Sequence, residues 1–338
     1  MNRTLLPAAW YTIAMNTLNS VLRILCDGRF HSGSALGETL SVSRAAVWKA
    51  IKKLQNEWQV KINAVPGRGY QLAVPLTLLD KDSILSAMGP QFQSQLQEIQ
   101  ILWSVDSTNR YTLNQASSGV VSGFAVLAEH QSAGRGRRGR HWVSPFGRNL
   151  YLSLLWEFEL DATQLSGLSL AIAVAITRAL TKVEINNVML KWPNDVLWQE
   201  RKLCGVLLEM KGEASGPWQV VIGIGMNVNM GSIKTEEIGQ PWVDLQSILG
   251  RDLDRNQLAG LILSELLDAM HQFQRSGLSP FLADWRARDV CRDKLVELHF
   301  PDRVEHGIAR GIDSSGALLL ESEGVVKPYH AGEVSLRY

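Results

Sequence analysis

Cysteine is scarce in this sequence. The 338 residues include only Cys26, Cys204 and Cys291, which lie far apart. Such spacing provides neither the closely spaced ligands of a zinc site nor a disulfide framework, and it is typical of proteins that stay in the reducing cytosol. We therefore predict a cytoplasmic protein without a metal site built from its own side chains.

Long hydrophobic runs are also missing. The most apolar stretch, from Leu165 to Leu180, falls short of about 18 consecutive apolar residues and contains Arg178. This pattern predicts a helix that is buried against a sheet, so we expect no association with a membrane.

The first fifteen residues, MNRTLLPAAWYTIAM, have some features of a weak signal peptide, but Pro7 interrupts their apolar middle. A second methionine, Met15, opens the amphipathic pattern that follows. We expect residues 1–15 to be an additional leader without function. A genuine targeting segment is the alternative.

An overall charge of either sign is lacking, since the formal net charge is only +1. Any anion-binding surface must therefore be local. Residues 16–75 carry such a surface, because eight basic and three acidic side chains give this segment a net charge of +5.

The same segment has the layout of a winged helix-turn-helix domain. Helical apolar spacing begins at Leu18, Ser43 can cap the second helix of the motif, and two short strands flank a tip at residues 66–69. The basic residues gather on that helix and on the hairpin, which meet DNA in such folds. A small helical domain with a solvated basic face is the alternative. We predict DNA contacts from Ser43, Arg44, Trp48, Lys49, Lys52 and Arg68.

The remaining chain predicts two further domains. Residues 76–286 combine apolar strands with long helical patterns, and strand often follows strand, which favours a mixed sheet with packed helices. Residues 287–338 show only short strands between turn residues and predict a small barrel. The expected fold class is α+β multidomain.

A phosphate loop of the GxxxxGK[ST] type is absent, but residues 134–140 read GRGRRGR, and no acidic residue occurs between His130 and Trp156. Glycines expose backbone N–H groups and arginines offer forked donors, so the motif predicts a bound phosphate or similar anion. A solvated loop and an RNA site are alternatives. The RNA site would have only Trp142 and Phe146 for stacking on bases.

Three shorter motifs are also suited to a ligand. Lys191 ends an apolar strand within KWPND, where Asp195 could be its counter-ion. Ser107 opens the polar run STN after another strand, which is typical of a helix N-cap. The run GIGMN at residues 223–227 is a weak glycine motif that could let a flat ligand approach the backbone. Each motif alone has an ordinary structural interpretation.

Taken in chain order behind a winged helix, the segments DSTN, AEHQSAGRGRRGRHW, LKWPNDV, RKLCGVLLE and GIGMNVN resemble the bifunctional biotin protein ligase and biotin operon repressor family. The resemblance covers residues 16–338. It implies a class II synthetase-like central domain, as in biotin and lipoate ligases, and an SH3-like C-terminal barrel. Met226 and Cys204 depart from the family pattern without removing a polar function.

The resemblance implies two successive reactions. Biotin and MgATP give biotinyl-5′-adenylate, and a lysine of the biotin carboxyl carrier protein of acetyl-CoA carboxylase then takes the biotin as an amide. The adenylate would also be a corepressor that promotes homodimerisation on the operator DNA of biotin-synthesis genes. The alternatives are a ligase with a non-functional DNA-binding domain and a lipoate-type acyl ligase.

Matching positions imply the roles of individual residues. Catalysis would depend on Lys191, Arg135, Arg137, Lys202 and Asp195, of which Asp195 would orient or deprotonate the incoming lysine. Biotin would be held by Ser107, Thr108, Asn109, Gln131, Arg135, Gly136, Arg137, Lys191 and Gly205. ATP and the adenylate would be held by Arg138, Arg140, Trp142, Asn194, Lys202, Asn227 and Trp242.

Overall fold

The computed structural model describes residues 8–212, 217–231, 238–332 and 334–338. The chain divides into two compact units, of which the first comprises Met1–Leu78 and Pro145–Arg148 and the second comprises Leu79–Ser144 and Asn149–Tyr338. The first seven residues of the predicted leader lie outside the described residues, and its predicted end at residue 15 lies within the first helix. The predicted division into four parts, with boundaries after residues 15, 75 and 286, stays a prediction.

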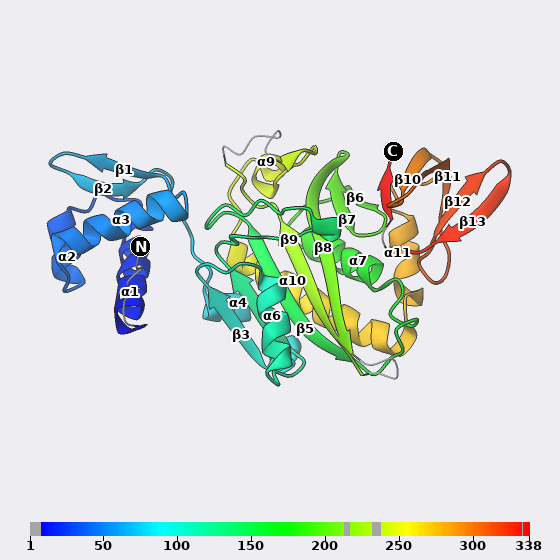
Figure 1. Cartoon of the computed structure of the whole chain (residues 1–338), viewed down its shortest axis with the longest axis horizontal. Coiled ribbons are helices and arrows are strands. Elements are labelled where there is room, and N and C mark those ends of the chain that lie inside the picture. The colour runs from blue at the N-terminus through cyan, green and yellow to red at the C-terminus, as the bar shows by residue number, and fades with distance from the viewer. Residues whose placement is uncertain (1–7, 213–216, 232–237, 333) are drawn as a thin grey trace, which may run out of the picture. The chain divides into compact units, whose positions relative to one another are not determined.

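The first unit has the winged-helix arrangement that the sequence predicts (Figure 1). Leu22 on the first helix and Ile51 on the third are almost fully buried and form part of the core of this unit. Ser43 caps the third helix, since its Oγ accepts a hydrogen bond from the backbone N–H of Ala46 at 3.1 Å. The elements are α1 (Ala8–Leu25), α2 (Gly33–Thr39), α3 (Arg44–Glu57), β1 (Ile62–Val65) and β2 (Gly69–Leu72).

The hairpin of β1 and β2 is the wing, and a close backbone approach fixes its base. Gly69 has a φ of +103°, and a Cβ there would lie 2.1 Å from the carbonyl oxygen of His31. Only glycine fits this position, where His31 and Tyr70 exchange backbone hydrogen bonds of 2.9 and 2.8 Å. At the wing tip, the guanidinium of Arg68 lies 4.0 Å from the ring centroid of Phe30.

The second unit is built on a mixed seven-stranded sheet with the strand order β3-β4-β5-β9-β8-β7-β6. The β3–β4 pair is parallel and the other neighbours are antiparallel. The strands are β3 (Glu98–Leu102), β4 (Phe124–Ala128), β5 (Leu150–Phe158), β6 (Val188–Lys191), β7 (Asp195–Trp198), β8 (Arg201–Gly212) and β9 (Trp218–Met226).

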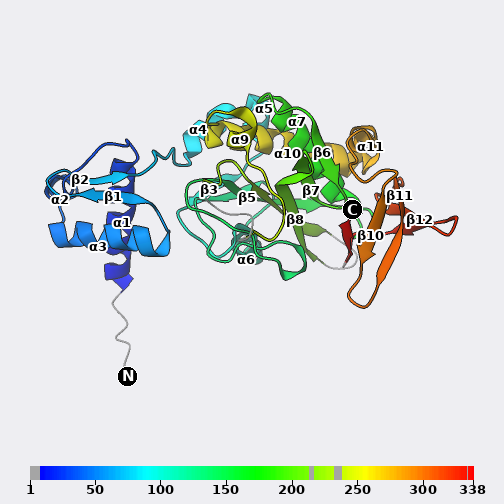
Figure 2. The ribbon, with the colours of Figure 1, turned by 90° about the horizontal axis from the view of Figure 1, so that it is seen from above.

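Helices cover both faces of this sheet (Figure 2). On one face, α7 (Leu168–Thr181) packs against α10 (Arg255–Ser276), and α10 also packs against α4 (Lys81–Ala87). On the other face, α6 (Thr108–Ser117) packs on β5 and β9. The remaining helical segments of this unit are α5 (Pro90–Gln93), η1 (Arg137–Gly139), α9 (Leu245–Leu249), η2 (Ser279–Phe281) and α11 (Leu282–Arg286).

The apolar stretch near Leu165 forms the buried helix that was predicted. Eleven of the 14 residues of α7 are buried, because the helix lies between the sheet and α10. Across the part of the chain that the structure describes, no helix combines the length and the hydropathy needed to cross a membrane.

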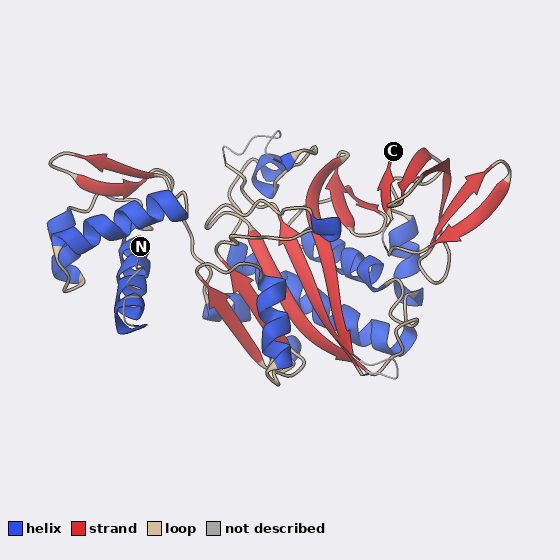
Figure 3. Ribbon diagram, in the orientation of Figure 1, coloured by secondary structure: helices blue, strands red, loops and turns tan. Residues whose placement is uncertain are grey.

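The C-terminal part of the second unit is a five-stranded antiparallel sheet, which agrees with the predicted small β-domain and confirms the fold class (Figure 3). In the strand order β13-β12-β11-β10-β14, the strands are β10 (Leu295–His299), β11 (Val304–Ile312), β12 (Leu318–Ser322), β13 (Val325–Tyr329) and β14 (Ser335–Arg337). A hydrogen bond joins the segments next to the two sheets, since the indole N–H of Trp192, after β6, donates at 3.1 Å to the carbonyl of Gly316, which precedes β12.

Candidate active site

One cavity of about 760 Å³ brings the predicted ligand motifs together. Its walls come from the start of α6, the loop that contains η1, the β6–β7 hairpin, parts of β8 and β9, and the residues of β14. The volume is within the range of pockets that hold small organic ligands. Among the predicted residues, the cavity is lined by Ser107, Thr108, Asn109, Gln131, Arg135, Gly136, Arg137, Arg138, Arg140, Trp142, Lys191, Asn194, Asp195, Lys202 and Gly205.

A network of mostly uncharged polar groups lies at one end of the cavity. Gln131 Oε1 accepts hydrogen bonds from the backbone N–H of Thr108 at 2.9 Å and from its hydroxyl at 3.2 Å. Ser153 Oγ donates to Asn109 Oδ1 at 2.6 Å and lies 2.8 Å from the hydroxyl oxygen of Thr108. These side chains are buried and fixed by one another, so this end of the cavity offers preorganised donors and acceptors to a neutral polar ligand.

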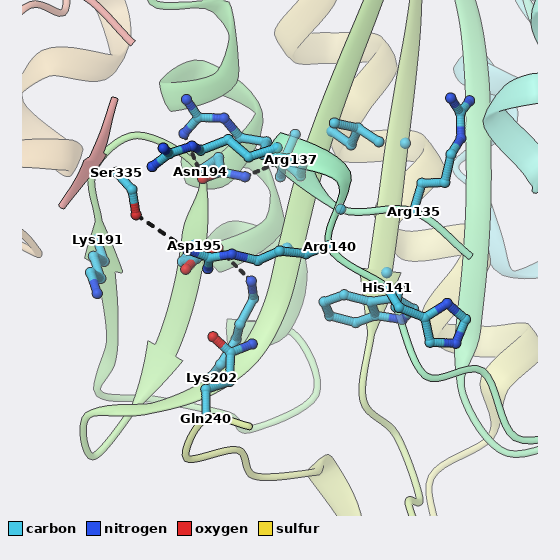
Figure 4. Close-up of a pocket in the computed structure, with 18 of the residues that line it drawn as sticks. Arg135, Arg137, Arg140, His141, Lys191, Asn194, Asp195, Lys202, Gln240 and Ser335 are labelled. Atoms are coloured by element: carbon cyan, nitrogen blue, oxygen red, sulfur yellow. Dashed lines mark hydrogen bonds and ion pairs between the residues drawn. The ribbon is translucent and has the colours of Figure 1, made fainter. Parts of the chain in front are cut away.

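Glu209 on β8 connects this network to the first arginine of the glycine-arginine motif. Its carboxylate accepts from Asn109 Nδ2 at 2.8 Å and pairs with Arg135 Nη2 at 3.0 Å. Figure 4 shows Arg135 extending away from Arg137 and Arg140. In this structure, therefore, Arg135 belongs to the neutral end of the cavity.

Two glycines that lie side by side on adjacent strands form a flat part of the cavity wall. Gly205 on β8 and Gly225 on β9 are register partners in adjacent strands. A Cβ on Gly225 would lie 2.5 Å from Cε2 of Trp142, and a Cβ on Gly205 would lie 3.2 Å from Cζ3 of the same indole. The glycines thus let a flat aromatic group lie directly against the backbone. The sequence suggested that a flat ligand could do so, and the Trp142 indole does so here.

The next arginines of the motif donate to the C-terminal sheet. Arg137 Nη2 bonds the carbonyl of Ala331, the carbonyl of Gly332 at 2.8 Å and that of Val334 at 3.2 Å. Its Nη1 bonds Asn194 Oδ1 at 3.3 Å, and Arg140 Nη2 bonds the Ser335 hydroxyl at 3.4 Å (Figure 4).

Arg138 also donates to this sheet, with Nη1 lying 3.4 Å from the carbonyl of His299. Among the described residues, Arg137, Arg138 and Arg140 donate to carbonyl, amide and hydroxyl oxygens and form no ion pair with a carboxylate. Their charge is therefore available to an anionic ligand, which binds guanidinium forks strongly.

Two lysines complete the charged end of the cavity. Lys202 Nζ pairs with Asp195 Oδ1 at 2.8 Å, and both side chains are largely buried. Lys191 and Asp195 are register partners in the β6–β7 hairpin, but the ion pair of Asp195 is with Lys202, so Asp195 is not the counter-ion of Lys191 alone. Burial lowers the pKa of Lys191, and the nearby charge of Asp195 opposes this shift.

Two of the residues predicted to hold ATP and the adenylate lie beside the main cavity. Asn227 and Trp242 line a smaller pocket, which shares His141, Trp142 and Lys202 with the main one. Asn227 Nδ2 donates to the carbonyls of Lys202 at 3.3 Å and Val243 at 3.2 Å. This amide therefore also fixes the strands that carry the site.

The structure adds site residues that the sequence patterns did not indicate. Glu209 and Ser153 orient the neutral network. Glu209 ends the RKLCGVLLE segment, but no role was predicted for it, and Ser153 lies within an apolar strand without a motif of its own. Ser335 and Tyr338 line the cavity from the C-terminal segment, which the sequence indicated only as part of a barrel. They reach the cavity because β14 pairs with β10, and the residues of β14 alone do not indicate this pairing.

The predicted DNA-contact residues lie in the first unit. Ser43, Arg44, Lys49 and Lys52 are exposed on or beside α3, and Arg68 is exposed at the wing tip. Trp48 on the same helix is 52% exposed, which is unusual because tryptophan side chains are mostly buried in folded proteins. These residues form the surface by which winged helices meet DNA, and their contacts stay a prediction.

Family models give the class of the protein. The model of the biotin/lipoate A/B protein ligase family matches residues 102–227, a helix-turn-helix domain model matches residues 17–71, and the biotin protein ligase C-terminal domain model matches residues 294–337. Together with the cavity, these matches define a biotin or lipoate protein ligase that carries a DNA-binding domain.

Individual relatives make the assignment narrower. The bifunctional ligase/repressor BirA of Salmonella typhimurium is 44% identical over 94% of this chain and 97% of that protein. The biotin–[acetyl-CoA-carboxylase] ligase of Paracoccus denitrificans is 34% identical over 69% of this chain and 98% of that protein. The chain belongs to the family of bifunctional biotin protein ligase/repressors.

A solved structure supports the fold of the second unit. The biotin protein ligase from Aquifex aeolicus in complex with biotin and ATP superposes with a TM-score of 0.62 at 31% identity, over 72% of this chain and 99% of that one.

Proposed function

We propose that this protein joins biotin to a lysine of the biotin carboxyl carrier protein of acetyl-CoA carboxylase, with MgATP as co-substrate, and that it also represses transcription. The observation that supports this most directly is that one cavity combines a buried neutral polar network with arginines that form no ion pair with a carboxylate of the described residues. The relatives with names that state these activities match nearly the whole chain.

The first step is activation of the carboxylate. A carboxylate oxygen of biotin forms a bond to the α-phosphorus of ATP, the bond from that phosphorus to the bridging oxygen breaks, and pyrophosphate leaves. Two anions must approach each other, and the lysines and arginines of the cavity supply the compensating charge. In this proposal Lys191 and Lys202 stabilise charge at the α-phosphate, while Arg137, Arg138 and Arg140 hold the phosphates.

The second step is transfer. The amine of the carrier lysine attacks the carbonyl carbon of the adenylate, loses a proton, and AMP leaves as the amide forms. In this proposal Asp195 orients the incoming amine, since its carboxylate lines the cavity and is fixed by Lys202. The neutral network, with Gln131, Thr108 and Asn109, holds the biotin ring.

Ligation can be tested with intact-mass spectrometry. The protein is mixed with MgATP, a biotin carboxyl carrier domain, and biotin or lipoate. We expect a mass gain of one biotinyl group on the carrier, and none with a carrier variant in which arginine replaces the acceptor lysine. Transfer of lipoate in place of biotin would favour a lipoate-type ligase instead.

We further propose that biotinyl-5′-adenylate is the corepressor and that it promotes a homodimer on two-fold operator DNA. One winged helix makes few phosphate contacts, so binding by a monomer should be weak and salt-sensitive, whereas two linked copies gain effective concentration. The exposed basic face of α3 and the wing supports this role.

A DNA-binding titration with the biotin-synthesis promoter tests the corepressor. We expect affinity to rise by about 10²-fold or more when biotinyl-5′-adenylate is present, as expected for two linked binding sites. The double variant Arg44→Ala/Lys49→Ala should lose most of this binding, while Lys327→Ala in the C-terminal sheet should not. Equal affinity for DNA with and without adenylate would contradict the corepressor proposal and would favour a ligase with a non-functional DNA-binding domain.

A further inference from the structure

Tyr338 lies at the charged end of the cavity, although no motif marks it. It directly follows β14, which pairs with β10 through Leu298 and Leu336. This pairing brings the C-terminal residue to the wall that Lys191 also lines. The sheet therefore fixes the backbone up to Arg337, the residue that precedes the tyrosine.

The ring of Tyr338 is the close partner of the Lys191 ammonium. Lys191 Nζ lies 4.9 Å from the ring centroid. None of the ion pairs in the described parts of the chain includes Lys191, although the side chain is partly buried. A buried ammonium without a carboxylate partner is costly, and an aromatic face at this distance stabilises the charge.

A second ammonium group also contacts the ring of Tyr338, which is 40% exposed. Lys294 Nζ lies 4.6 Å from the same centroid, and Lys294 is itself paired with Glu200 at 3.0 Å. Two ammonium groups therefore share one ring, and one of them is anchored to a carboxylate. Burial raises the pKa of Tyr338 to about 12, helped by the nearby Cys291, so the phenol is neutral at physiological pH.

From this geometry we infer that Tyr338 is a positioning residue that holds the Lys191 ammonium at the cavity wall for the carboxylate and phosphate that react there. The inference rests on the proposed ligase function, because it assigns Lys191 to the adenylation step. The aromatic face, rather than the hydroxyl, is the part of Tyr338 that acts.

Two substitutions separate the ring from the hydroxyl. Tyr338→Phe keeps the aromatic face, whereas Tyr338→Leu keeps apolar bulk without it. In the full-length protein, we expect Tyr338→Leu to lower kcat/KM for biotin-dependent pyrophosphate release by about 3- to 10-fold, as for the loss of one cation–π contact. Tyr338→Phe should stay within about 2-fold of wild type, and so should Tyr329→Leu, a matched tyrosine on β13.

A double-mutant cycle distinguishes positioning from a general effect on structure. In a Lys191→Met background, Tyr338→Leu should cause no further loss, because the ammonium that it holds is gone. An equal loss in both backgrounds, or full activity of Tyr338→Leu, would overturn the inference. Failure of the wild-type protein to release pyrophosphate with biotin would instead contradict the proposed ligase function.

Discussion

Replacing Lys191 with methionine is expected to slow biotin-dependent pyrophosphate release by about 10²–10³-fold, the usual cost of removing one preorganised charge from a transition state. Methionine keeps the length and apolar character of the side chain, so the β6–β7 hairpin should be preserved. The loss should be mainly in kcat, since the lysine is assigned to charge that builds up as the carboxylate reaches the α-phosphorus.

A second lysine on the same sheet gives the control. Lys211 lies exposed on β8 and bonds the Ser117 hydroxyl at 2.9 Å, away from the cavity. Lys211→Met should release pyrophosphate at the wild-type rate. A wild-type rate for Lys191→Met as well would remove this lysine from the adenylation step.

The second large effect is expected from Gly225→Leu. The new side chain would occupy the place where Trp142 lies against β9, because even a Cβ there would be 2.5 Å from the indole. The indole must then move into the cavity. We expect the affinity for biotin to fall by about 10- to 100-fold, which corresponds to typical overpacking costs, in isothermal titration calorimetry.

A graded series and a matched strand position make the result interpretable. Gly225→Ala should cause a smaller loss than Gly225→Leu, and Gln219→Leu, near the other end of β9, should bind biotin normally. Thermal unfolding of all three variants reports whether the sheet is preserved. Normal biotin binding by Gly225→Leu would show that the flat glycine wall does not form the ligand site.

The sequence predicted the parts of this protein that depend on local pattern. Helical spacing and a serine cap indicated α3, and an apolar run indicated the buried α7. The order of short motifs indicated the ligand residues, because each motif keeps its chemistry within a few positions of the chain. Most of these residues line one cavity in the structure.

Contacts that depend on strand register or on pairing between distant strands could not be predicted in this way. Asp195 was placed beside Lys191, but its partner is Lys202, which approaches across a β7–β8 hairpin whose register shifts between Val196 and Leu197. Nothing in KWPND indicates that shift. The contribution of β14 to the cavity wall was not predicted either, since its pairing with β10 joins segments more than 30 residues apart.

The wall contributed by β14 has a consequence for synthesis of the protein. The cavity combines residues from Ser107 to Tyr338, and Arg137 is held by carbonyls at positions 331, 332 and 334. During synthesis on the ribosome, a chain that does not yet include this segment lacks one side of the cavity. We therefore expect adenylate formation to begin only after translation has passed β14, because earlier chains lack the carbonyls that hold Arg137.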